Sequence, residues 1–243
     1  MATYNGARFI AQQLESILSQ LPADAEVIVA DDGSTDETLE IIRKFEDSRV
    51  RVLSAGSHLG PVYNFERALK EARGDVVFLS DQDDVWLPGK VPAMLDALGY
   101  ENGGFCTDSP WLAVHDAILV DSACEPLPST SRYSQYMTMW SRRPYRGGVY
   151  RNWLKNSFTG CCMAFRRDLL KVALPFPKRL PMHDQWLGLL AERKYGVASV
   201  HQTLILYRLH ENNATQMVGG RSAGFAQRLK WRWNLLVALL FRH

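Results

Sequence analysis

Short apolar runs alternate with amphipathic segments through the first half of the chain, and this alternation restricts the fold more than any other feature of the sequence. Three runs have the composition of buried strands, at residues 26–30 (EVIVA), 49–53 (RVRVL) and 76–79 (VVFL). Before and between these runs apolar residues recur at helical spacing, as in residues 8–20, which precede the first run. Because strands of this kind are usually buried on both faces, the pattern predicts an α/β fold with a mostly parallel, Rossmann-like sheet covered by helices.

The same patterns predict elements along the rest of the chain. Helices are expected at about 36–45, 61–72, 88–98 and 184–194, and strands at 111–120, 161–165, 197–201 and 204–207. Trp186 falls at helical spacing among leucines and is predicted to be a core residue. Residues 121–150 have no clear period, which predicts a long mobile loop.

Acidic residues follow two of the three apolar runs, at the point where each run ends. They are Asp31 and Asp32 after the first run, and Asp81, Asp83 and Asp84 after the third. Ligands of parallel sheets bind beyond the carboxyl ends of the strands, and those ends share one edge of the sheet. Two acidic turns on one edge therefore predict a single binding site rather than two solvated loops.

The second acidic turn has the composition of a cation site. Three carboxylates within four positions repel one another unless a positive charge neutralises them. Hard divalent cations such as Mg²⁺ or Mn²⁺ prefer carboxylate oxygens and leave room for substrate phosphates. For so short a motif taken alone, a solvated acidic turn is the alternative.

Composition argues against several classes of protein. A net charge of +2 does not favour nucleic-acid binding. The sequence has neither a GxGxxG fingerprint after the first strand position nor a GxxxxGK[ST] motif. Its four cysteines lack CxxC spacing and are predicted to be reduced, core or near-core thiols in a reducing compartment. It shows no signal-peptide pattern, and no apolar run reaches the ~20 residues of a membrane-spanning helix.

Residues 217–243 form a tail that is basic, aromatic and apolar. Lysine and arginine beside tryptophan and leucine are typical of a helix that lies in the interface of an anionic membrane. The tail therefore predicts a cytoplasmic protein bound peripherally to the inner face of the cytoplasmic membrane. The alternative is a C-terminal helix packed on the domain.

Five stretches together resemble a known family. They are TYNG, VIVADDGSTDET, GDVVFLSDQDDVW, MHDQWLGLLAERKYGV and LYRLHENN. In this order and spacing they resemble the bacterial family 2 glycosyltransferases of GT-A fold, most of all the rhamnosyltransferase-like enzymes of O-antigen, capsule and exopolysaccharide assembly. The resemblance covers residues 1–216 and implies a donor half at 1–100 and an acceptor half at 101–216. It implies transfer of a sugar, possibly rhamnose, from a nucleotide diphosphate to a hydroxyl of a glycan or lipid-linked glycan, with inversion.

The resemblance also implies a role for each matching residue. Thr3 and Tyr4 would line the nucleotide pocket, Asp31 and Asp32 would bind the base and ribose, and Asp81 would lie near the ribose. Asp83 and Asp84 would hold a divalent metal (Mn²⁺ or Mg²⁺) on the diphosphate, and His210 would make a further contact with the metal or the diphosphate. Asp184 would act as the general base. Arg208 is expected either to meet the diphosphate or to lie on the surface. The family often has Glu-Asp where this chain has His183-Asp184, so a role for His183 in tuning Asp184 is open.

These roles suit the chemistry of the transfer. A nucleotide diphosphate leaving group gains negative charge as the glycosidic bond breaks, and a divalent metal stabilises that charge. Inversion by single displacement needs a base opposite the leaving group to take the proton of the acceptor. Asp184 suits that role and also suits the N-cap of the helix that follows it.

Two other functions are compatible with acidic turns on such a sheet. A nucleotidyltransferase also uses acids and metal on a parallel sheet, but it usually opens with a Gly-rich basic loop that TYNGAR lacks. A truncated, non-catalytic scaffold of a polysaccharide assembly complex is the third possibility.

The chain departs from the family at its first strand. Family members begin with an apolar strand before TYNG, and here that strand is missing, which predicts a marginally stable sheet.

Overall fold

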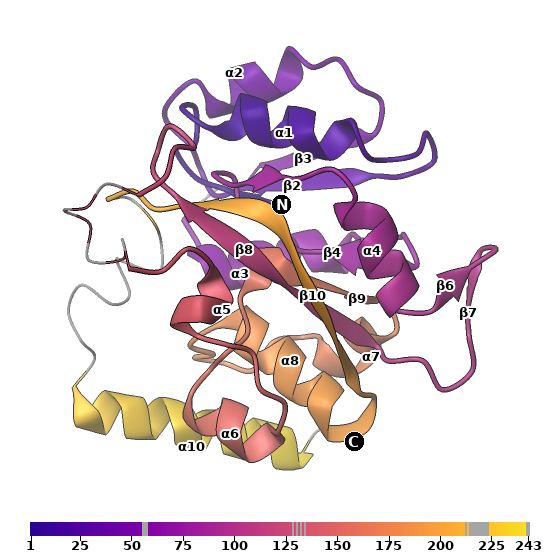
Figure 1. Ribbon diagram of the computed structural model, residues 1–243, viewed down its shortest axis with the longest axis vertical. Helices are drawn as coiled ribbons and strands as arrows, with labels where there is room; N and C mark the ends of the chain where they lie inside the picture. Colours follow the sequence, from indigo (N-terminus) through magenta and orange to yellow (C-terminus); the bar gives the residue numbers. More distant parts are fainter. Residues whose placement is uncertain are drawn as a thin grey trace.

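A computed structural model describes residues 1–54, 58–127, 129, 131, 133, 135–211, 213 and 224–241. Two sheets form the centre of the molecule, with helices on either side (Figure 1). Two helices, α1 and α2, cover one end, and the last helix, α10, lies at the opposite end. The predicted α/β class is confirmed.

The first sheet consists of three parallel strands in the order β1-β2-β3. Its strands are β1 (Ala2–Thr3), β2 (Val27–Asp31) and β3 (Val50–Ser54), and its helices are α1 (Ile10–Leu18), α2 (Thr38–Arg43) and α3 (Pro61–Lys70). All five residues of β2 are buried, as expected for a β-branched, apolar run at the centre of a parallel sheet. The short αβ connections place the ends of β1 and β2 at the same edge.

The second sheet has five strands in the order β4-β9-β8-β10-β5. They are β4 (Val76–Phe78), β9 (Met163–Arg166), β8 (Leu112–Val120), β10 (Val197–Arg208) and β5 (Val85–Trp86). Only β8 and β10 run parallel here, and the other three pairs are antiparallel. The prediction of two strands, at residues 197–201 and 204–207, is wrong, because residues 197–208 form one continuous strand whose register shifts at two places along β8. The pair of residues in β5 carried no strand signal of its own.

The first strand joins the two sheets. Besides pairing with β2, Ala2 donates its N–H to the carbonyl of Ser80, just beyond β4, at 3.2 Å. The amino group of Met1 donates to the carbonyl of Ile28 at 2.8 Å and is buried. Burial lowers the pKa of this amino group to about 5. The two-residue strand β1 therefore stands where the family resemblance implies a longer apolar strand, which was predicted to be missing here.

Adding about five apolar residues before Met1 is expected to raise the melting temperature (Tm) by roughly 2–8 °C. The extension removes a buried amino group that must lose its proton when the chain folds at pH 6, because burial lowers its pKa to about 5. Removing this cost is worth about 1–2 kcal/mol, and each kcal/mol shifts Tm by about 2–4 °C in a chain of this length. Calorimetry at pH 6 and pH 9 checks this result.

A Gly-Ser extension of equal length is the control. It also removes the charge, so its gain should appear at pH 6 and vanish at pH 9. Above pH 8 the amino group is neutral in both states, whereas below pH 8 the unfolded chain binds the proton first. Equal Tm values for all three chains at pH 6 would contradict the prediction.

The remaining elements lie outside these two sheets. They are α4 (Lys90–Ala97), β6 (Tyr100–Glu101), β7 (Gly104–Phe105), α5 (Met139–Arg142), α6 (Val149–Leu154), the 3₁₀ turn η1 (Gly160–Cys162), α7 (Leu169–Ala173), α8 (His183–Lys194) and α10 (Phe225–Phe241). The prediction of one long loop at residues 121–150 is wrong, because α5 and the start of α6 lie within this stretch. Residues 128, 130, 132 and 134 of that stretch lie outside the described residues.

The largest buried cluster lies between the second sheet and helices α7, α8 and α10. Trp186 is fully buried in it, as predicted, and Leu235 and Leu239 of α10 belong to the same cluster. One face of the tail helix is therefore packed on the domain. Of the helices in the described residues, none has both the length and the hydrophobicity needed to cross a bilayer.

The cysteines are all free thiols. Cys161 and Cys162 are buried and Cys124 is half-buried. The prediction of core or near-core thiols is wrong for Cys106, which is exposed. It follows the two-stranded β6–β7 hairpin, an element that the sequence did not indicate.

Candidate active site

The first acidic turn is built around Asp31, the last residue of β2. Its carboxylate is fully buried and accepts the N–H groups of Gly33 and Ser34 at 3.1 and 2.9 Å, and the hydroxyl of Thr3 at 3.0 Å. Gly33 has a φ of +87°, a conformation that side chains disfavour. Asp31 thus fixes the turn and ties β1 to β2.

Asp32 holds the start of α3. Its two oxygens accept the N–H groups of Leu59 and Gly60, each at 2.8 Å, and His58 Nδ1 lies 2.9 Å from Oδ2. Both acids of this turn therefore have backbone partners, which fixes the loops around the expected nucleotide pocket. Neither carboxylate points away into solvent, since Asp31 and Asp32 are buried.

Gln82 connects the second acidic turn to Tyr4, although the sequence did not single it out. Its amide accepts the N–H of Tyr4 at 2.8 Å and donates to the carbonyl of Tyr4 at 3.0 Å. A Cβ on Gly6 would collide with the Gln82 side chain. The ring of Tyr4 is 44% exposed and lies 4.4 Å from the His58 ring, centroid to centroid. The predicted pocket residues Thr3 and Tyr4 thus lie beside both turns.

The second acidic turn meets the end of β10 through Asp83 and His210. The Nε2 atom of His210 lies 2.8 Å from Oδ2 of Asp83, and the Asn213 amide donates to the same oxygen at 3.2 Å. Adjacent ligands of an octahedral cation lie about 3 Å apart, because each bond is 2.0–2.1 Å long. The two predicted ligands, more than a hundred residues apart in sequence, are therefore in direct contact at a spacing like that of neighbouring cation ligands, and their role as ligands stays a prediction.

Arg208, the last residue of β10, holds the second acidic turn in place. Its guanidinium donates to the carbonyl of Asp83 at 3.1 Å, to Sγ of Cys124 at 2.9 Å and to the side chain of Gln12. It also lies 4.9 Å from the centroid of the Phe9 ring and is 2% exposed. The alternative of a surface residue is wrong, and a diphosphate contact stays a prediction.

Asp84 and Asp81 lie close together in a poorly solvated place. Burial raises the pKa of Asp84 well above its usual range, and the charges of Asp83 and Asp81 raise it further. Burial also raises the pKa of Asp81 to about 7, helped by the charges of Asp83 and Asp184. The four carboxyl groups therefore interact electrostatically, although Asp184 is a hundred residues away in sequence.

The donor set around Asp84 fits a hard divalent cation. Oδ2 of Asp84 is buried and has no hydrogen-bond partner among the described residues. Ligand atoms of Asp81, Asp84 and Cys161 all lie within 4.8 Å of one another. The pKa of the Cys161 thiol is raised by its hydrogen bond with Cys162 and by burial, so it stays protonated, and Mg²⁺ and Mn²⁺ prefer oxygen. The carboxylates are therefore the fitting ligands.

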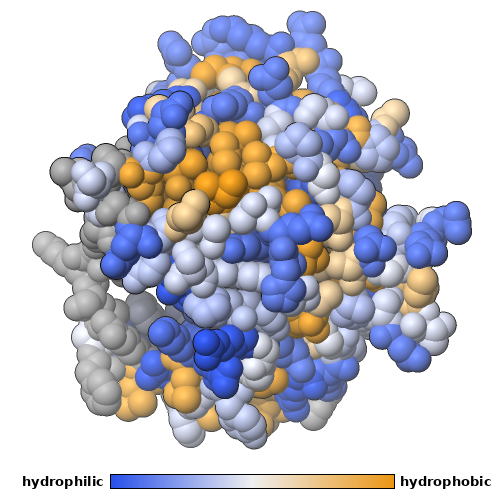
Figure 2. Space-filling model, in the orientation of Figure 1, coloured by the Kyte–Doolittle hydropathy of each residue, from blue (hydrophilic) through white to orange (hydrophobic). Residues whose placement is uncertain are grey.

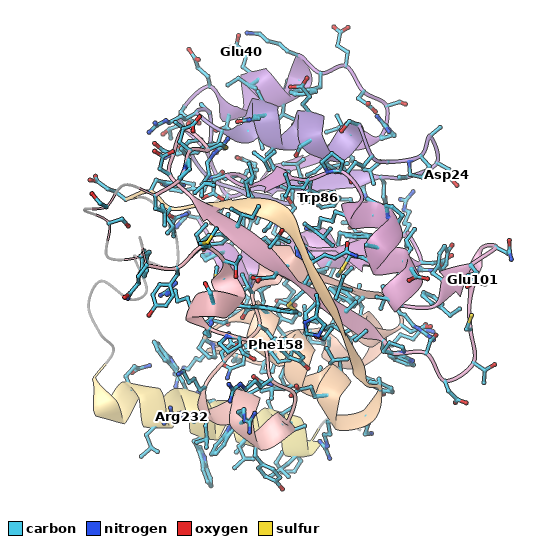
Figure 3. The ribbon with its side chains drawn as sticks, viewed as in Figure 1. Asp24, Glu40, Trp86, Glu101, Phe158 and Arg232 are labelled. Carbon is cyan, nitrogen blue, oxygen red and sulfur yellow. The ribbon has the colours of Figure 1, made fainter. Side chains whose placement is uncertain are left out.

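Lys90 is a buried cation next to the acids. Its ammonium group donates to the carbonyl of Cys161 at 2.7 Å and lies 4.3 Å from the ring centroid of Trp86, which Figure 3 labels. Burial lowers its pKa to about 8, while nearby Asp84 and Asp81 act in the opposite direction. A lysine at the start of a helix is ordinarily exposed, so no sequence signal revealed this role.

Replacing Lys90 with methionine is expected to lower the free energy of unfolding by about 3–5 kcal/mol, because the acids lose their buried counter-charge. Thermal denaturation should show a Tm lower by roughly 6–20 °C. Millimolar Mn²⁺ should recover part of this loss if the carboxylates bind it. Lys44→Met, at an exposed lysine paired with Glu40, is the control and should shift Tm little. A Tm unchanged by Lys90→Met would refute the role.

Asp184 lies in the first turn of α8 and is held by several donors. Its Oδ1 accepts the N–H of Gln185 at 2.5 Å and the Asn156 amide at 3.2 Å. Burial raises its pKa to about 6, although Arg143, these donors and the N–H of Gly160 favour the ionised form. The N-cap residue of α8 is Met182, so the N-cap alternative for Asp184 is wrong.

His183 is buried and uncharged. Burial lowers its pKa to about 3, and its ring stacks on Phe65 with centroids 4.1 Å apart. Both ring nitrogens lack a hydrogen-bond partner in the described part of the chain. A Cβ built on Gly160 would lie 3.1 Å from Nε2, so His183 fills the space behind the Asp184 turn.

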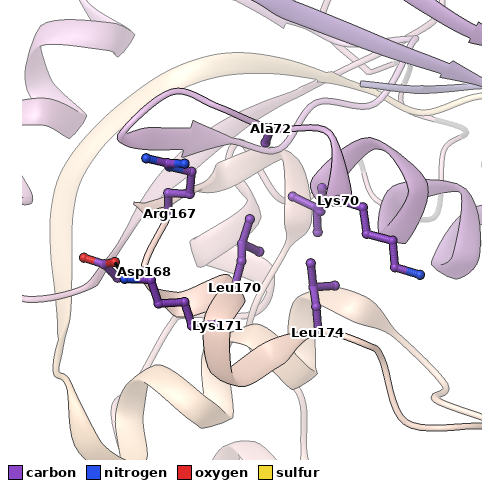
Figure 4. Close-up of a pocket in the computed structure, with 8 residues that line it drawn as sticks. Lys70, Ala72, Arg167, Asp168, Leu170, Lys171 and Leu174 are labelled. Atoms are coloured by element: carbon purple, nitrogen blue, oxygen red, sulfur yellow. Dashed lines mark ion pairs between the residues drawn. The ribbon is translucent and has the colours of Figure 1, made fainter.

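Two surface cavities lie apart from the acidic turns. One, of about 350 Å³, opens between α3 and α7 and is lined by Lys70, Arg167 and Lys171 (Figure 4). Each of these cations is paired with a carboxylate. The other, of about 440 Å³, lies between residues 179–181 and α10. Neither has the acids on which the predicted chemistry depends.

The amino-acid sequence matches known proteins over most of its length. The family described as "Glycosyl transferase family 2" matches residues 1–174. The dTDP-rhamnosyl transferase RfbG of Shigella flexneri is 28% identical over 231 residues, covering 88% of this chain and 72% of RfbG. The UDP-Glc:alpha-D-GlcNAc-diphosphoundecaprenol beta-1,3-glucosyltransferase WfgD of Escherichia coli is 24% identical, covering 97% and 83%.

Solved structures share the fold. The crystal structure of S. aureus TarS 1-349 in complex with UDP-GlcNAc has a TM-score of 0.69 at 21% identity, over 99% of this chain and 65% of that one. The mannosyltransferase PcManGT from Pyrobaculum calidifontis, in complex with GDP-Man and Mn²⁺, has a TM-score of 0.63 at 19% identity, over 94% and 61%. The chain thus has the predicted GT-A fold.

Proposed function

This chain belongs to glycosyltransferase family 2, and from that membership we propose that it transfers a sugar from a nucleotide diphosphate donor to a hydroxyl group, inverting the anomeric centre. The acceptor is a glycan or lipid-linked glycan of a bacterial cell-surface polysaccharide. RfbG is described as a dTDP-rhamnosyl transferase, which makes rhamnose the first donor sugar to test. The name of WfgD includes a diphosphoundecaprenol-linked acceptor, and this relative therefore supports a lipid-linked acceptor for the present chain.

The observation that carries this proposal is the closeness of Asp184 to the second acidic turn. Two chain segments a hundred residues apart bring a carboxylate with a pKa of about 6 within electrostatic reach of Asp81. A base whose pKa is close to the working pH is effective, because it is ionised and can still accept a proton. Asp184 takes the proton of the acceptor hydroxyl, while the acidic turn faces the donor.

The donor side is assigned to the residues around both turns. Thr3, Tyr4, Asp31 and Asp32 shape the nucleotide pocket, with Asp81 and Arg208 toward the ribose and diphosphate. Asp83, Asp84 and His210 hold a divalent cation, supported by the unpartnered oxygen of Asp84 and the Asp83–His210 contact. Bound there, Mn²⁺ or Mg²⁺ would stabilise charge on the leaving diphosphate.

A donor screen tests the proposal. The protein is incubated with dTDP-rhamnose, UDP-glucose, UDP-GlcNAc and GDP-mannose, each with Mn²⁺, Mg²⁺ or chelator, and release of the nucleotide diphosphate is measured. Metal-dependent release with one donor is the expected result. Nucleotide binding without turnover of any donor would favour the non-catalytic scaffold instead. A nucleotidyltransferase would instead join a nucleoside triphosphate to a sugar 1-phosphate and release pyrophosphate, which separate samples with those two substrates would reveal.

The rate of transfer is expected to rise with pH and to reach half its maximum near pH 6. The cause is Asp184, which is inactive as a base when protonated, and burial raises its pKa to about 6. Asn156→Ala should move the midpoint to higher pH, because the Asn156 amide favours the ionised carboxylate. Initial rates between pH 4.5 and 8.5 check both results. A midpoint unmoved by Asn156→Ala would count against Asp184 as the titrating group.

The tail is proposed to bring the enzyme to its acceptor. Residues 217–243 would contact the inner face of the cytoplasmic membrane, where a lipid-linked acceptor is presented. The basic and aromatic composition of the tail supports this location. No nucleic-acid partner is proposed.

A further inference from the structure

Two segments that pack against each other contain no acidic residue. Residues 126–167 have eight lysines and arginines and no aspartate or glutamate, and residues 212–243 have five and none. Helix α6 belongs to the first segment and α10 to the second, and the two helices lie side by side at one end of the molecule (Figure 1). The charged lysine and arginine side chains of these two segments are therefore all positive, although the whole chain has a net charge of only +2.

Direct hydrogen bonds fix the two helices together. Trp153 Nε1 of α6 donates to the carbonyl of Arg232 at 3.0 Å, and the Arg232 side chain donates to the carbonyl of Leu154 at 2.8 Å. Figure 3 labels Arg232 at this junction. On its inner side α10 buries Leu235 and Leu239 in the main core. The outer faces of α6 and α10 consequently form one surface, here called the α6–α10 surface.

Exposed hydrophobic side chains gather on the α6–α10 surface. In the described part of the chain nine large hydrophobic residues are exposed, and six of them lie on these two helices: Tyr150, Leu154, Leu229, Trp233, Leu240 and Phe241. On α10 the spacing of Leu229, Trp233 and Leu240 places them along one stripe. Figure 2 shows hydrophobic and hydrophilic side chains next to each other at this end of the molecule.

Cations border this apolar stripe without acidic partners. Arg151, Lys155 and Lys230 are exposed, and none of them takes part in an ion pair within the described residues. A symmetric dimer through this surface would set cations against cations, since a two-fold interface brings the same patch to both sides. A second copy of the chain is therefore a poor occupant.

We propose that the α6–α10 surface binds the surface of an anionic phospholipid bilayer, with α6 and α10 both inserting their exposed apolar side chains among the headgroups. Apolar burial beside lysine and arginine is how interfacial helices bind such membranes. The proposal rests on the proposed function in one respect: α6 adjoins the base. The carbonyl of Asn152 accepts the Gln185 amide at 2.7 Å, and Asn156 donates to Asp184. Docking there brings a membrane-bound acceptor to the Asp184 side of the enzyme.

Sedimentation with vesicles tests the proposal. The full chain is mixed with vesicles of phosphatidylcholine alone or with 30% phosphatidylglycerol, about one lipid in three. We expect the wild-type chain to bind only the anionic vesicles. Two double variants, Tyr150→Gln with Leu154→Gln on α6 and Leu229→Gln with Trp233→Gln on α10, should each bind these vesicles at least tenfold more weakly than the wild type. Met137→Gln, at a residue 82% exposed and outside this surface, is the control and should bind within twofold of the wild type.

Several outcomes would overturn the inference. Wild-type binding by the α6 variant would mean that the tail acts alone. Equal binding to neutral vesicles would remove the role of charge. A dimer in sedimentation equilibrium that both double variants abolish would make the surface a protein interface. Melting curves exclude misfolding, and turnover of a soluble donor separates the two hypotheses: vesicle binding without turnover refutes the proposed function and leaves the membrane surface intact.

Discussion

Replacing Asp184 with asparagine is expected to lower the rate of sugar transfer by about 10²–10⁴-fold, the usual contribution of a general base. Asparagine keeps the shape of the side chain and its acceptor oxygen for the N–H of Gln185, so the turn at the start of α8 should survive. It cannot take the proton of the acceptor. Affinity for UDP or dTDP in the presence of Mn²⁺, measured by calorimetry, should change less than threefold, because donor binding does not use the base.

Asp168→Asn is the matched control for this experiment. Asp168 immediately precedes α7, whereas Asp184 lies in the first turn of α8, and the Asp168 side chain is about half exposed and pairs with Lys171 outside the site. If Asp184 served only the helix, both variants would lose the same small stability, about 0.3–1 kcal/mol, and both would keep their rate. A full transfer rate in Asp184→Asn would therefore end its assignment as the base.

Replacing Asp83 with asparagine is expected to lower metal-dependent turnover of the donor at least a hundredfold. The change removes one negative charge from the oxygen that faces His210 Nε2 at 2.8 Å, and a lost cation contact costs several kcal/mol of charge stabilisation on the leaving diphosphate. The Mn²⁺ concentration for half-maximal activity should rise more than tenfold. Titration of activity with Mn²⁺ and Mg²⁺ measures both effects.

Two companion variants locate the cation. His210→Gln should also raise the half-maximal Mn²⁺ concentration, about 10–100-fold, if His210 is a ligand or orients one. Asp96→Asn removes an exposed carboxylate of α4 and should leave the titration unchanged. An Asp83→Asn protein with the wild-type metal dependence would rule out Asp83, and would leave Asp84 with Asp81 as the remaining acids for the cation.

The acidic turns and the base illustrate what could be predicted at the outset. Asp31 and Asp81 follow apolar strands, as the sequence indicates, but these strands lie in different sheets. Their turns come together because β1, which pairs with β2, also donates a hydrogen bond to Ser80 just beyond β4. Asp184 was found through family resemblance, since an aspartate before a helix has no distinctive pattern of its own. In the tertiary structure the charge of Asp184 helps to raise the pKa of Asp81, so the two carboxyl groups lie within electrostatic reach of each other.

Other residues of the site had no sequence signal. Gln82 pairs with the backbone of Tyr4 only because β1 lies beside the second acidic turn. Lys90 is buried because α4 begins against Cys161 and Trp86, which come from other parts of the chain. Arg208 holds Asp83 across 125 positions. Contacts between such distant positions depend on which strands become neighbours, and side-chain periodicity carries no information on that order.

The sequence by itself determined the fold class, the two acidic turns and the basic, apolar character of the tail, because each depends on local spacing, residue type or charge. Tertiary structure alone decided how strands β9, β8, β10 and β5 pair, which acids lose solvent, and that α6 joins α10 in one surface. Burial changes the chemistry of a group. Asp184 has the same side chain as any surface aspartate, but burial of its carboxyl group in the folded domain raises its pKa to about 6. The site arises where local patterns from distant segments are brought into one poorly solvated volume.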